Sequence, residues 1–319
     1  MNKKNDSIID VRAVTKIFGG IVAVNHVTFT VDRGEIFGFL GPNGAGKTTT
    51  IRMLTGLLTP NSGNIFIDGI DIKKNPIKAK MKMGVIPEAG NIYADLTAKQ
   101  NIILAGRFYG ISRRELRKRA DSLLVQFQLD ERKDDVIKTF SKGMRQRVNI
   151  ASALVHQPEI LFLDEPTSGL DVQSQRLTKT IIKQMNQKGT TIFLTTHNIE
   201  EANQLCERVA IINKGKIVII DKPEKLRNTF ETTQSVEISF DKSIDENLIG
   251  QSNCVNRIER LGDKWKLYTD NPDTLVKYLT RFAEDKHLSI ISMEICRASL
   301  EDAFIKLTEA AHEHTHHYQ

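Results

Sequence analysis

Nine residues at positions 41–49 constrain the fold more than any other part of the chain, because their spacing fits the phosphates of a nucleotide. The first eight match the pattern G-x-x-x-x-G-K-[ST] in full, and the nine read Gly41, Pro42, Asn43, Gly44, Ala45, Gly46, Lys47, Thr48 and Thr49. An apolar run at 35–40 predicts a buried strand before them, and an amphipathic run at 49–54 predicts a helix after them. Glycines let the backbone curl until successive N–H groups face one anion, and the helix N-terminus adds partial positive charge. The sequence therefore predicts a strand–loop–helix site for nucleotide phosphates.

The chemistry of such a site needs a cation, a metal ligand and a base. We expect Lys47 to reach the β- and γ-phosphates and the Thr48 hydroxyl to ligate Mg²⁺. Far downstream, an apolar run at 160–163 predicts a strand that ends in Asp164 and Glu165. Asp164 is placed to hold Mg²⁺ through its water shell, and Glu165 to accept a proton from, or orient, the attacking water. Acids that follow strands are often only solvated, but together with the loop at 41–49 they favour a hydrolytic site.

Between these two motifs lies Phe-Ser-Lys-Gly-Met-Arg-Gln-Arg at 140–147, followed by a helical pattern. Ser141 is a candidate N-cap and Gly143 permits close backbone approach, so the segment predicts a second anion-binding helix N-terminus. A basic capped helix without that role is the other reading of these residues alone. The segment resembles the signature motif of ABC-type ATPases, which no other P-loop class carries between its two nucleotide motifs. The resemblance assigns Ser141, Lys142, Gly143 and Met144 to the nucleotide of a second copy, in trans.

The remaining parts of that family follow in family order. Residues 168–171 resemble the D-loop with Asp171, His197 resembles the switch histidine, and Phe18 occupies the place of an aromatic that stacks on adenine. On its own, a histidine at a strand end is usually structural and a phenylalanine is usually core. The resemblance covers roughly residues 8–225.

The resemblance implies an α/β P-loop NTPase of the ABC type, with a mixed sheet and a helical subdomain, that binds ATP and Mg²⁺. It also implies a head-to-tail dimer in which each nucleotide lies between the 41–49 loop of one copy and the signature of the other. Binding would close this sandwich and hydrolysis would reopen it, because the γ-phosphate cross-links the two surfaces. His197 would contact that phosphate, and Asp171 would report across the interface.

Two departures from the family pattern bear on the site. Glu88 occupies the position of a glutamine that touches Mg²⁺ and the water. A carboxylate can still ligate Mg²⁺, although it adds negative charge beside the γ-phosphate. Lys142 and Met144 replace the commonest glycine and glutamine of the signature. Because Lys47, Asp164, Glu165 and His197 are all present, we expect ATP hydrolysis.

The domain organisation follows from where the motifs stop. We expect an ABC nucleotide-binding domain at 1–228, with its helical subdomain at about 92–155, then a small α+β domain at 229–309 and a His-rich tail at 310–319. Strands predicted at 235–240, 255–261, 265–269 and 289–295, with helices at 273–287 and 300–307, suggest a ferredoxin-like order. Residues 298–304 resemble the closing motif of the C-terminal extension in drug-resistance and sodium-efflux ABC subunits. The tail either binds Zn²⁺ or Ni²⁺ or is solvated.

Composition agrees with this reading. Among the 319 residues no stretch approaches the ~20 apolar residues that span a bilayer, and we expect no signal peptide. Three scattered cysteines argue against a disulfide framework and fit a reducing compartment. The net charge of +6 permits attraction to anionic lipid, or it reflects ordinary solvated side chains. We expect a peripheral location on the cytoplasmic face of the cell membrane.

Two function classes follow. The first is the ATPase subunit of an ABC transporter, which by resemblance is of the export type. Its permease would be on a separate chain, and it would pair with a second copy or with a sibling ATPase. The second is a soluble ABC ATPase that acts on nucleic acid or ribosomes. The families of the second class carry a long coiled-coil insertion or two nucleotide domains, and this chain has neither. The basic residues at 113–119 fit an exposed helix face without interleaved aromatics, so no nucleic acid is expected.

Overall fold

The computed structural model describes residues 7–229, 234–249 and 252–296. The chain divides into two compact units, Met1–Lys222 and Pro223–Gln319. The boundary expected after residue 228 falls inside α8 (Pro223–Thr229), which belongs to the second unit. The helix expected at 300–307 and the His-rich tail at 310–319 lie outside the described residues.

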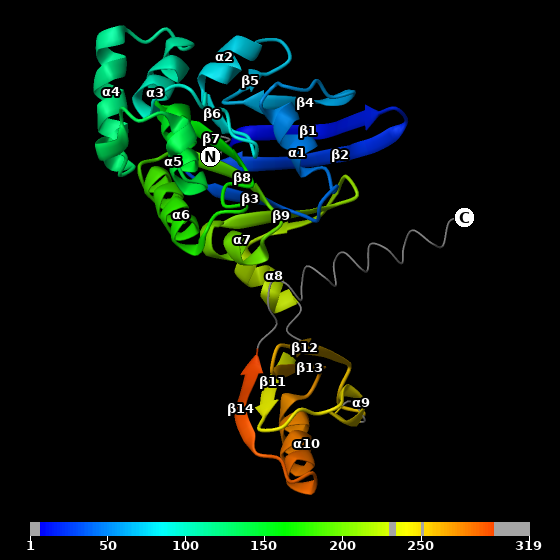
Figure 1. The fold of residues 1–319 in the computed structure, drawn as a ribbon. Helices are drawn as coiled ribbons and strands as arrows, with labels where there is room; N and C mark the ends of the chain where they lie inside the picture. The colour runs from blue at the N-terminus through cyan, green and yellow to red at the C-terminus, as the bar shows by residue number, and fades with distance from the viewer. Residues whose placement is uncertain (1–6, 230–233, 250–251, 297–319) are drawn as a thin grey trace. The chain divides into compact units, whose positions relative to one another are not determined.

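Two sheets form the first unit (Figure 1). The antiparallel sheet has the order β2-β1-β4-β5, formed by β1 (Ser7–Phe18), β2 (Ile21–Asp32), β4 (Ser62–Ile67) and β5 (Ile70–Asp71). The larger sheet has the order β10-β9-β3-β8-β7-β6, formed by β3 (Ile36–Leu40), β6 (Met83–Ile86), β7 (Ile160–Asp164), β8 (Thr191–Thr196), β9 (Arg208–Asn213) and β10 (Lys216–Asp221). All its neighbours pair in parallel except β9 with β10. The mixed sheet expected from the sequence is confirmed.

An aromatic cluster holds the two sheets together. Phe29 of the antiparallel sheet packs against rings of β3 and β8, and Phe193 of β8 also packs against Phe162 of β7, with neighbouring ring centroids 5.5–6.0 Å apart. Strands β3 and β7 are buried along their whole length, which explains their uninterrupted apolar sequences. Helix α1 (Lys47–Leu54) contacts β2, β7 and β8, and buries Met53 and Leu54 in the same core. The carboxyl ends of three central parallel strands are thereby fixed relative to one another.

A helical part follows β6. Helix α3 (Ala98–Arg107) packs on both α4 (Arg113–Gln126) and α5 (Lys142–Leu154), and Figure 1 shows α3 and α4 side by side. Thr97 begins α3 with a capping box completed by Gln100, and Ser112 caps α4. The first unit also contains α2 (Pro76–Met81), α6 (Val172–Gln187), α7 (Ile199–Leu205) and the short 3₁₀ turns Asp130–Arg132 and Ile137–Thr139.

The second unit is the ferredoxin-like fold expected from the sequence. Its described elements run β11 (Gln234–Phe240), α9 (Glu246–Ile249), β12 (Arg257–Leu261), β13 (Lys264–Thr269), α10 (Pro272–Asp285) and β14 (Ile290–Cys296). The sheet order β12-β13-β11-β14 is antiparallel throughout. Val236, Ile238 and Leu267 pack with Leu275 and Leu279 of α10 in a separate core. In neither unit does a described helix have the length and apolar character needed to cross a membrane.

One titratable side chain in the first unit is built into the packing. The His156 ring stacks on Tyr109 with centroids 3.5 Å apart, and its Nε2–H donates to the Met83 carbonyl oxygen. Its Nδ1 is buried and has no hydrogen-bond partner among the described residues. Burial therefore lowers the pKa of His156 to about 4, because a proton on Nδ1 would have no acceptor.

This shift makes stability depend on pH. The folded-state pKa of about 4 lies below the ordinary value near 6.5, so the neutral ring stabilises the fold above pH 6.5. That contribution is lost as the pH falls from 6.5 to 4. We expect His156→Phe, which keeps a ring on Tyr109, to lose less unfolding free energy between pH 7 and pH 5 than the wild type. Chemical denaturation at both pH values measures this. The exposed His26→Asn serves as control, and equal pH dependence in all three proteins would contradict the assignment.

Candidate nucleotide-binding site

The loop at 41–49 joins β3 to α1, as the sequence predicts, and its glycines are required by geometry. Gly44 and Gly46 have φ angles of 79° and 107°, in the left-handed region that favours glycine. A β-carbon at Gly46 would stand 2.6 Å from the Ala23 carbonyl oxygen, and one at Gly41 would stand 2.5 Å from that of Ile212. Helix α1 has no side-chain cap, so its first N–H groups remain available to an anion.

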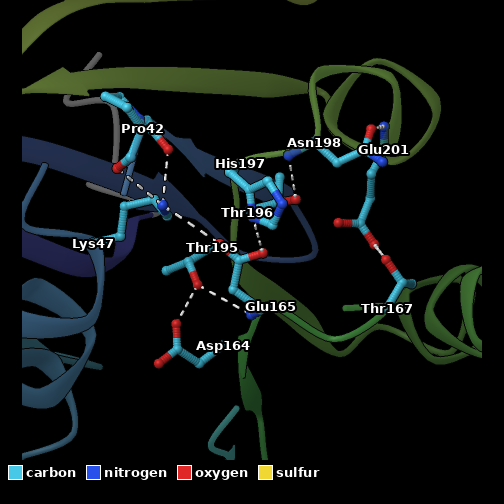
Figure 2. A network of polar contacts seen from close by, with 11 residues as sticks. Pro42, Lys47, Asp164, Glu165, Thr167, Thr195, Thr196, His197, Asn198 and Glu201 are labelled. Atoms are coloured by element: carbon cyan, nitrogen blue, oxygen red, sulfur yellow. Dashed lines mark hydrogen bonds and ion pairs between the residues drawn. The ribbon is translucent and has the colours of Figure 1, made fainter. Parts of the chain in front are cut away.

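Lys47 is buried and lies across this loop. Its Nζ donates to the carbonyl oxygens of Gly41 at 2.8 Å and Pro42 at 3.2 Å, and lies 3.4 Å from Oε1 of Glu165 (Figure 2). These three oxygens share one ammonium group. A phosphate placed over the loop would offer Lys47 a full negative charge in exchange for the two carbonyl oxygens.

Asp164 ends β7 and is held by the neighbouring strand. It is 5% exposed, and one oxygen accepts a 2.5 Å hydrogen bond from the Thr195 hydroxyl. The parallel register places Asp164 opposite Thr195, so β8 supplies this partner directly. The same hydroxyl accepts the backbone N–H of Glu165 at 3.2 Å. Thr195 therefore orients both acids of the β7 end, a role that the sequence alone did not indicate.

Glu165 and His197 form a close pair. Oε2 of Glu165 lies 2.7 Å from Nδ1 of His197, which follows β8 directly (Figure 2). The Glu165 side chain is 9% exposed, whereas that of His197 is 52% exposed. Glu165 has a φ angle of 51°, uncommon for a residue with a β-carbon and a form of backbone strain that accumulates at functional sites. The carboxylate is thus held between Lys47 on one oxygen and His197 on the other.

These residues surround one cavity of about 330 Å³. Its lining includes Glu88, Glu165 and His197 together with residues of the loop, namely Asn43, Gly44, Gly46, Lys47, Thr48 and Thr49. Ser168, the first residue of the segment that resembles the D-loop, also lines it, as does Ala23, to which no sequence signal had pointed. Asp164 is not among the residues that line the cavity, and its carboxylate accepts the hydrogen bond from Thr195. Phe18 lies at the end of β1, which pairs with β2, the strand that contains Ala23. The Phe18 side chain is 44% exposed, and Nζ of Lys16 lies 5.1 Å from the centroid of its ring.

The signature residues do not line this cavity. Ser141 begins α5, and its hydroxyl oxygen accepts the Met144 N–H at 3.2 Å, so the predicted N-cap is confirmed. A β-carbon at Gly143 would overlap the side chain of Ser174. Ser174 lies in the first turn of α6, which Asp171 caps by accepting the Ser174 N–H. Asp171 accepts Ser174 N–H at 2.8 Å and its hydroxyl at 2.7 Å, and these bonds, the backbone one first, lower the pKa of Asp171. The Lys142 ammonium lies against Gly169 of the same segment.

Comparison with known proteins assigns this arrangement to a family. Residues 24–168 match the family model described as ABC transporter. The linearmycin resistance ATP-binding protein LnrL of Bacillus subtilis (strain 168) is 35% identical over 92% of this chain and 96% of its own length. The chain belongs to the ABC transporter family. Nod factor export ATP-binding protein I of Cupriavidus metallidurans is 35% identical over 95% of this chain, and the daunorubicin/doxorubicin resistance protein DrrA of Streptomyces peucetius is 33% identical over 97%.

Solved structures agree. An ATP-binding subunit of an ABC transporter has a TM-score of 0.64 and 32% identity, covering 70% of this chain and 93% of its own. The cassette MJ0796, solved as a dimer bound to ADP and Pi, has a TM-score of 0.62 and 29% identity, covering 67% and 98%. This ABC protein is therefore an ATPase and the ATP-binding subunit of a transporter, as the resemblance implied.

The exposed ring of Phe18 generates a prediction for this ABC ATPase. Phe18→Ala should weaken ATP binding by roughly tenfold, since stacking of a base on an aromatic ring contributes about 1–3 kcal/mol. Phe18→Trp should preserve binding. Titration with a fluorescent ATP analogue measures both. Ile21→Ala is the matched control, because Ile21 pairs with Phe18 across the β1–β2 hairpin and is 74% exposed. Equal affinities of Phe18→Ala and the control would remove Phe18 from the site.

Proposed function

We propose that this chain is the ATP-hydrolysing subunit of an exporter, and that it closes head to tail as a dimer on ATP to drive separate membrane subunits. One observation carries the catalytic part of this proposal. Glu165 borders the same cavity as the phosphate-binding loop and is held between Lys47 and His197. A hydrolase needs a base beside the γ-phosphate, and this carboxylate has the position for it.

Nucleotide binding uses groups that the fold has already oriented. The glycine loop and the open N-terminus of α1 supply N–H donors for the phosphates. Lys47 would leave the carbonyl oxygens of Gly41 and Pro42 for the β- and γ-phosphates, and the ring of Phe18 would stack on adenine. Lys47 would thereby exchange neutral carbonyl acceptors for anionic phosphate oxygens, and the adenine would cover the exposed ring of Phe18.

The residues present also fit Mg²⁺. Thr48 and Glu88 line the cavity with oxygen donors, and one Asp164 oxygen is used by Thr195, which leaves the other for a metal-bound water. Hard oxygen ligands with retained waters are what Mg²⁺ prefers. Among the described residues, no three His, Cys, Asp or Glu side chains lie together as a metal site, so water would have to complete the coordination. The ion, when bound, would neutralise charge on the phosphates. The protein's part is to orient Thr48, Asp164 and Glu88 around it.

For the chemical step, Glu165 would accept a proton from the attacking water, or orient it. His197 holds the Oε2 side of that carboxylate, and its exposed ring can also face the γ-phosphate. Lys47 would balance the charge of both the phosphate and Glu165. Ser141 and Gly143, with Lys142 and Met144, would complete the site from a second copy, and Asp171 would lie at that interface. The second copy is either the same chain or a sibling ATPase.

The export direction and the membrane partner are inferred from the relatives. LnrL and DrrA are named for resistance and the Nod factor protein for export, and each aligns over more than nine-tenths of this chain. A cavity of about 330 Å³ lies between α3, α5 and the segment after β6, with Tyr93 57% exposed and Phe108 76% exposed on its wall. We propose this groove, on the cytoplasmic face of the membrane, as the permease contact. The alternative, a soluble ABC ATPase acting on nucleic acid or ribosomes, is not favoured by these relatives.

Glu165→Gln tests the catalytic assignment. The amide keeps the size and the contact with Lys47 but cannot accept a proton, so ATP should bind and hydrolysis should fall by about 100-fold or more. Phosphate release measures turnover, and size-exclusion chromatography with ATP should show an accumulated dimer. Glu200→Gln is the control, because Glu200 is exposed and bonds only to Gln204 among the described residues. Unchanged turnover in Glu165→Gln would exclude Glu165 as the base.

The trapped dimer also tests the transporter assignment. Affinity purification of Glu165→Gln with ATP and Mg²⁺ from gently solubilised native membranes, followed by mass spectrometry, should recover a polytopic membrane protein in near-stoichiometric amount. Recovery of ribosomal or nucleic-acid-binding proteins, with no membrane protein, would support the alternative instead.

Glu88→Gln tests the departure from the family pattern. Glu88 is exposed at the cavity wall, so its carboxylate is solvated and adds negative charge near the phosphates. The glutamine should retain turnover within about threefold or raise it, because the amide oxygen can still ligate Mg²⁺ without repelling phosphate. Steady-state hydrolysis over a range of Mg²⁺ concentrations measures this. Loss of activity would assign Glu88 a specific role that requires its charge.

A further inference from the structure

Glu201 is a buried carboxylic acid that the mechanism above does not use. It lies in the first turn of α7 and is 1% exposed. Within the described part of the chain it forms no ion pair, and the Lys179 ammonium donates to Gln204 instead. Burial raises the pKa of Glu201. Burying such a group is costly, so hydrogen bonds to its carboxyl group must compensate for the lost hydration.

Those partners lie beside the two residues of the proposed catalytic pair. The Thr167 hydroxyl donates to Oε1 of Glu201 at 2.7 Å. The Glu201 N–H donates to the Asn198 side chain, and the Asn198 N–H in turn donates to the Thr196 hydroxyl. Thr167 follows Glu165 by two residues, and Thr196 immediately precedes His197. Figure 2 shows Glu201 on the opposite side of this network from Lys47. Glu201 is thus connected to both segments that present the Glu165–His197 pair, through its carboxyl group on one side and through its N–H and Asn198 on the other.

The local backbone explains why such an anchor is needed. Glu165 has its positive φ at the point where the chain leaves β7, and a strained residue persists only where its surroundings fix it. Before the turn, the Glu165 N–H is fixed by the Thr195 carbonyl oxygen at 3.1 Å. After the turn, Thr167 is fixed by Glu201. On the other segment, the Asn198 side chain caps α7 at the Glu201 N–H, and the Asn198 N–H donates to the Thr196 hydroxyl.

We propose that Glu201 is a positioning residue for ATP hydrolysis, which holds the loop after Glu165 and the end of β8 in the register that brings Glu165 against His197. It touches neither nucleotide nor water itself. The inference rests on the proposed roles of Glu165 and His197. It predicts that losing the Glu201 contacts slows the chemical step while ATP still binds, because the phosphate-binding loop has no contact with Glu201 among those described.

The test separates this role from a general contribution to folding. Glu201→Ala and Glu201→Leu remove the acceptor, and Leu also keeps the volume filled. Both should lower kcat by roughly 10- to 100-fold, the scale expected when a catalytic group is misplaced by about 1 Å, with KM for ATP changed less than about threefold. Glu201→Gln keeps an acceptor oxygen and should restore most of the rate. Glu200→Ala, on the exposed side of the same turn, is the matched control.

Thr167 supplies an independent variant should Glu201→Ala fail to fold. Thr167→Val removes only the hydroxyl and should reproduce the loss of kcat, whereas Thr167→Ser should retain the rate. The double variant Thr167→Val/Glu201→Ala should be no slower than either single variant, because both remove one contact. In a Glu165→Gln background, Glu201→Leu should bind a fluorescent ATP analogue as tightly as the parent.

Three results would overturn the proposal: wild-type kcat in a folded Glu201→Leu protein, additive losses in the double variant, or parallel losses of kcat and ATP affinity. None of these would affect the proposed function, which depends on wild-type hydrolysis and on the loss of turnover in Glu165→Gln. Conversely, full turnover in Glu165→Gln would overturn the catalytic assignment whatever the Glu201 variants do.

Discussion

Parallel pairing of β3, β8 and β7 is the constraint on which the site depends. The pairing aligns Leu40 with Thr196 and Asp164 with Thr195, so the loop, the acids and the histidine all leave the sheet at one edge. Burial drives this pairing, because the rings of Phe37, Phe162 and Phe193 can leave water only if the three strands lie together. The packing of these strands therefore brings together residues more than 100 positions apart, such as Lys47 and Glu165.

Charge within the site is balanced before a nucleotide enters. Lys47 is buried and would be costly alone, and it is compensated by two carbonyl oxygens and by Glu165. Glu165 in turn shares its second oxygen with His197. A triphosphate changes this balance at Lys47 first, and Lys47 contacts the proposed base directly. Nucleotide binding at the loop would therefore change the surroundings of Glu165 through its ion pair with Lys47.

Much of this site could be predicted from the sequence, because its motifs are local. The 41–49 loop, the Ser141 cap and the acids after β7 each follow from residues within one turn or one strand end. Thr195, Thr167 and Glu201 could not be predicted, since their roles depend on the register of β7 with β8 and on how α7 packs against the loop after Glu165. In the second unit, alternating apolar residues were enough to predict the strands, while the order β12-β13-β11-β14 needed the known fold as a guide.

The sequence predicts anion sites at the N-termini of α1 and α5, and these two ends differ in how many of their backbone N–H groups have no side-chain cap. Helix α1 begins after Gly46, which has no side chain to cap it, so its first N–H groups can all face phosphate. Helix α5 begins after Ser141, whose hydroxyl oxygen already accepts the Met144 N–H. The Ser141 hydroxyl hydrogen and the earlier N–H groups remain to contact an anion from outside. The first end can thus surround a phosphate, whereas the second can contact only one face of it, which is the complementarity that a nucleotide shared between two copies requires.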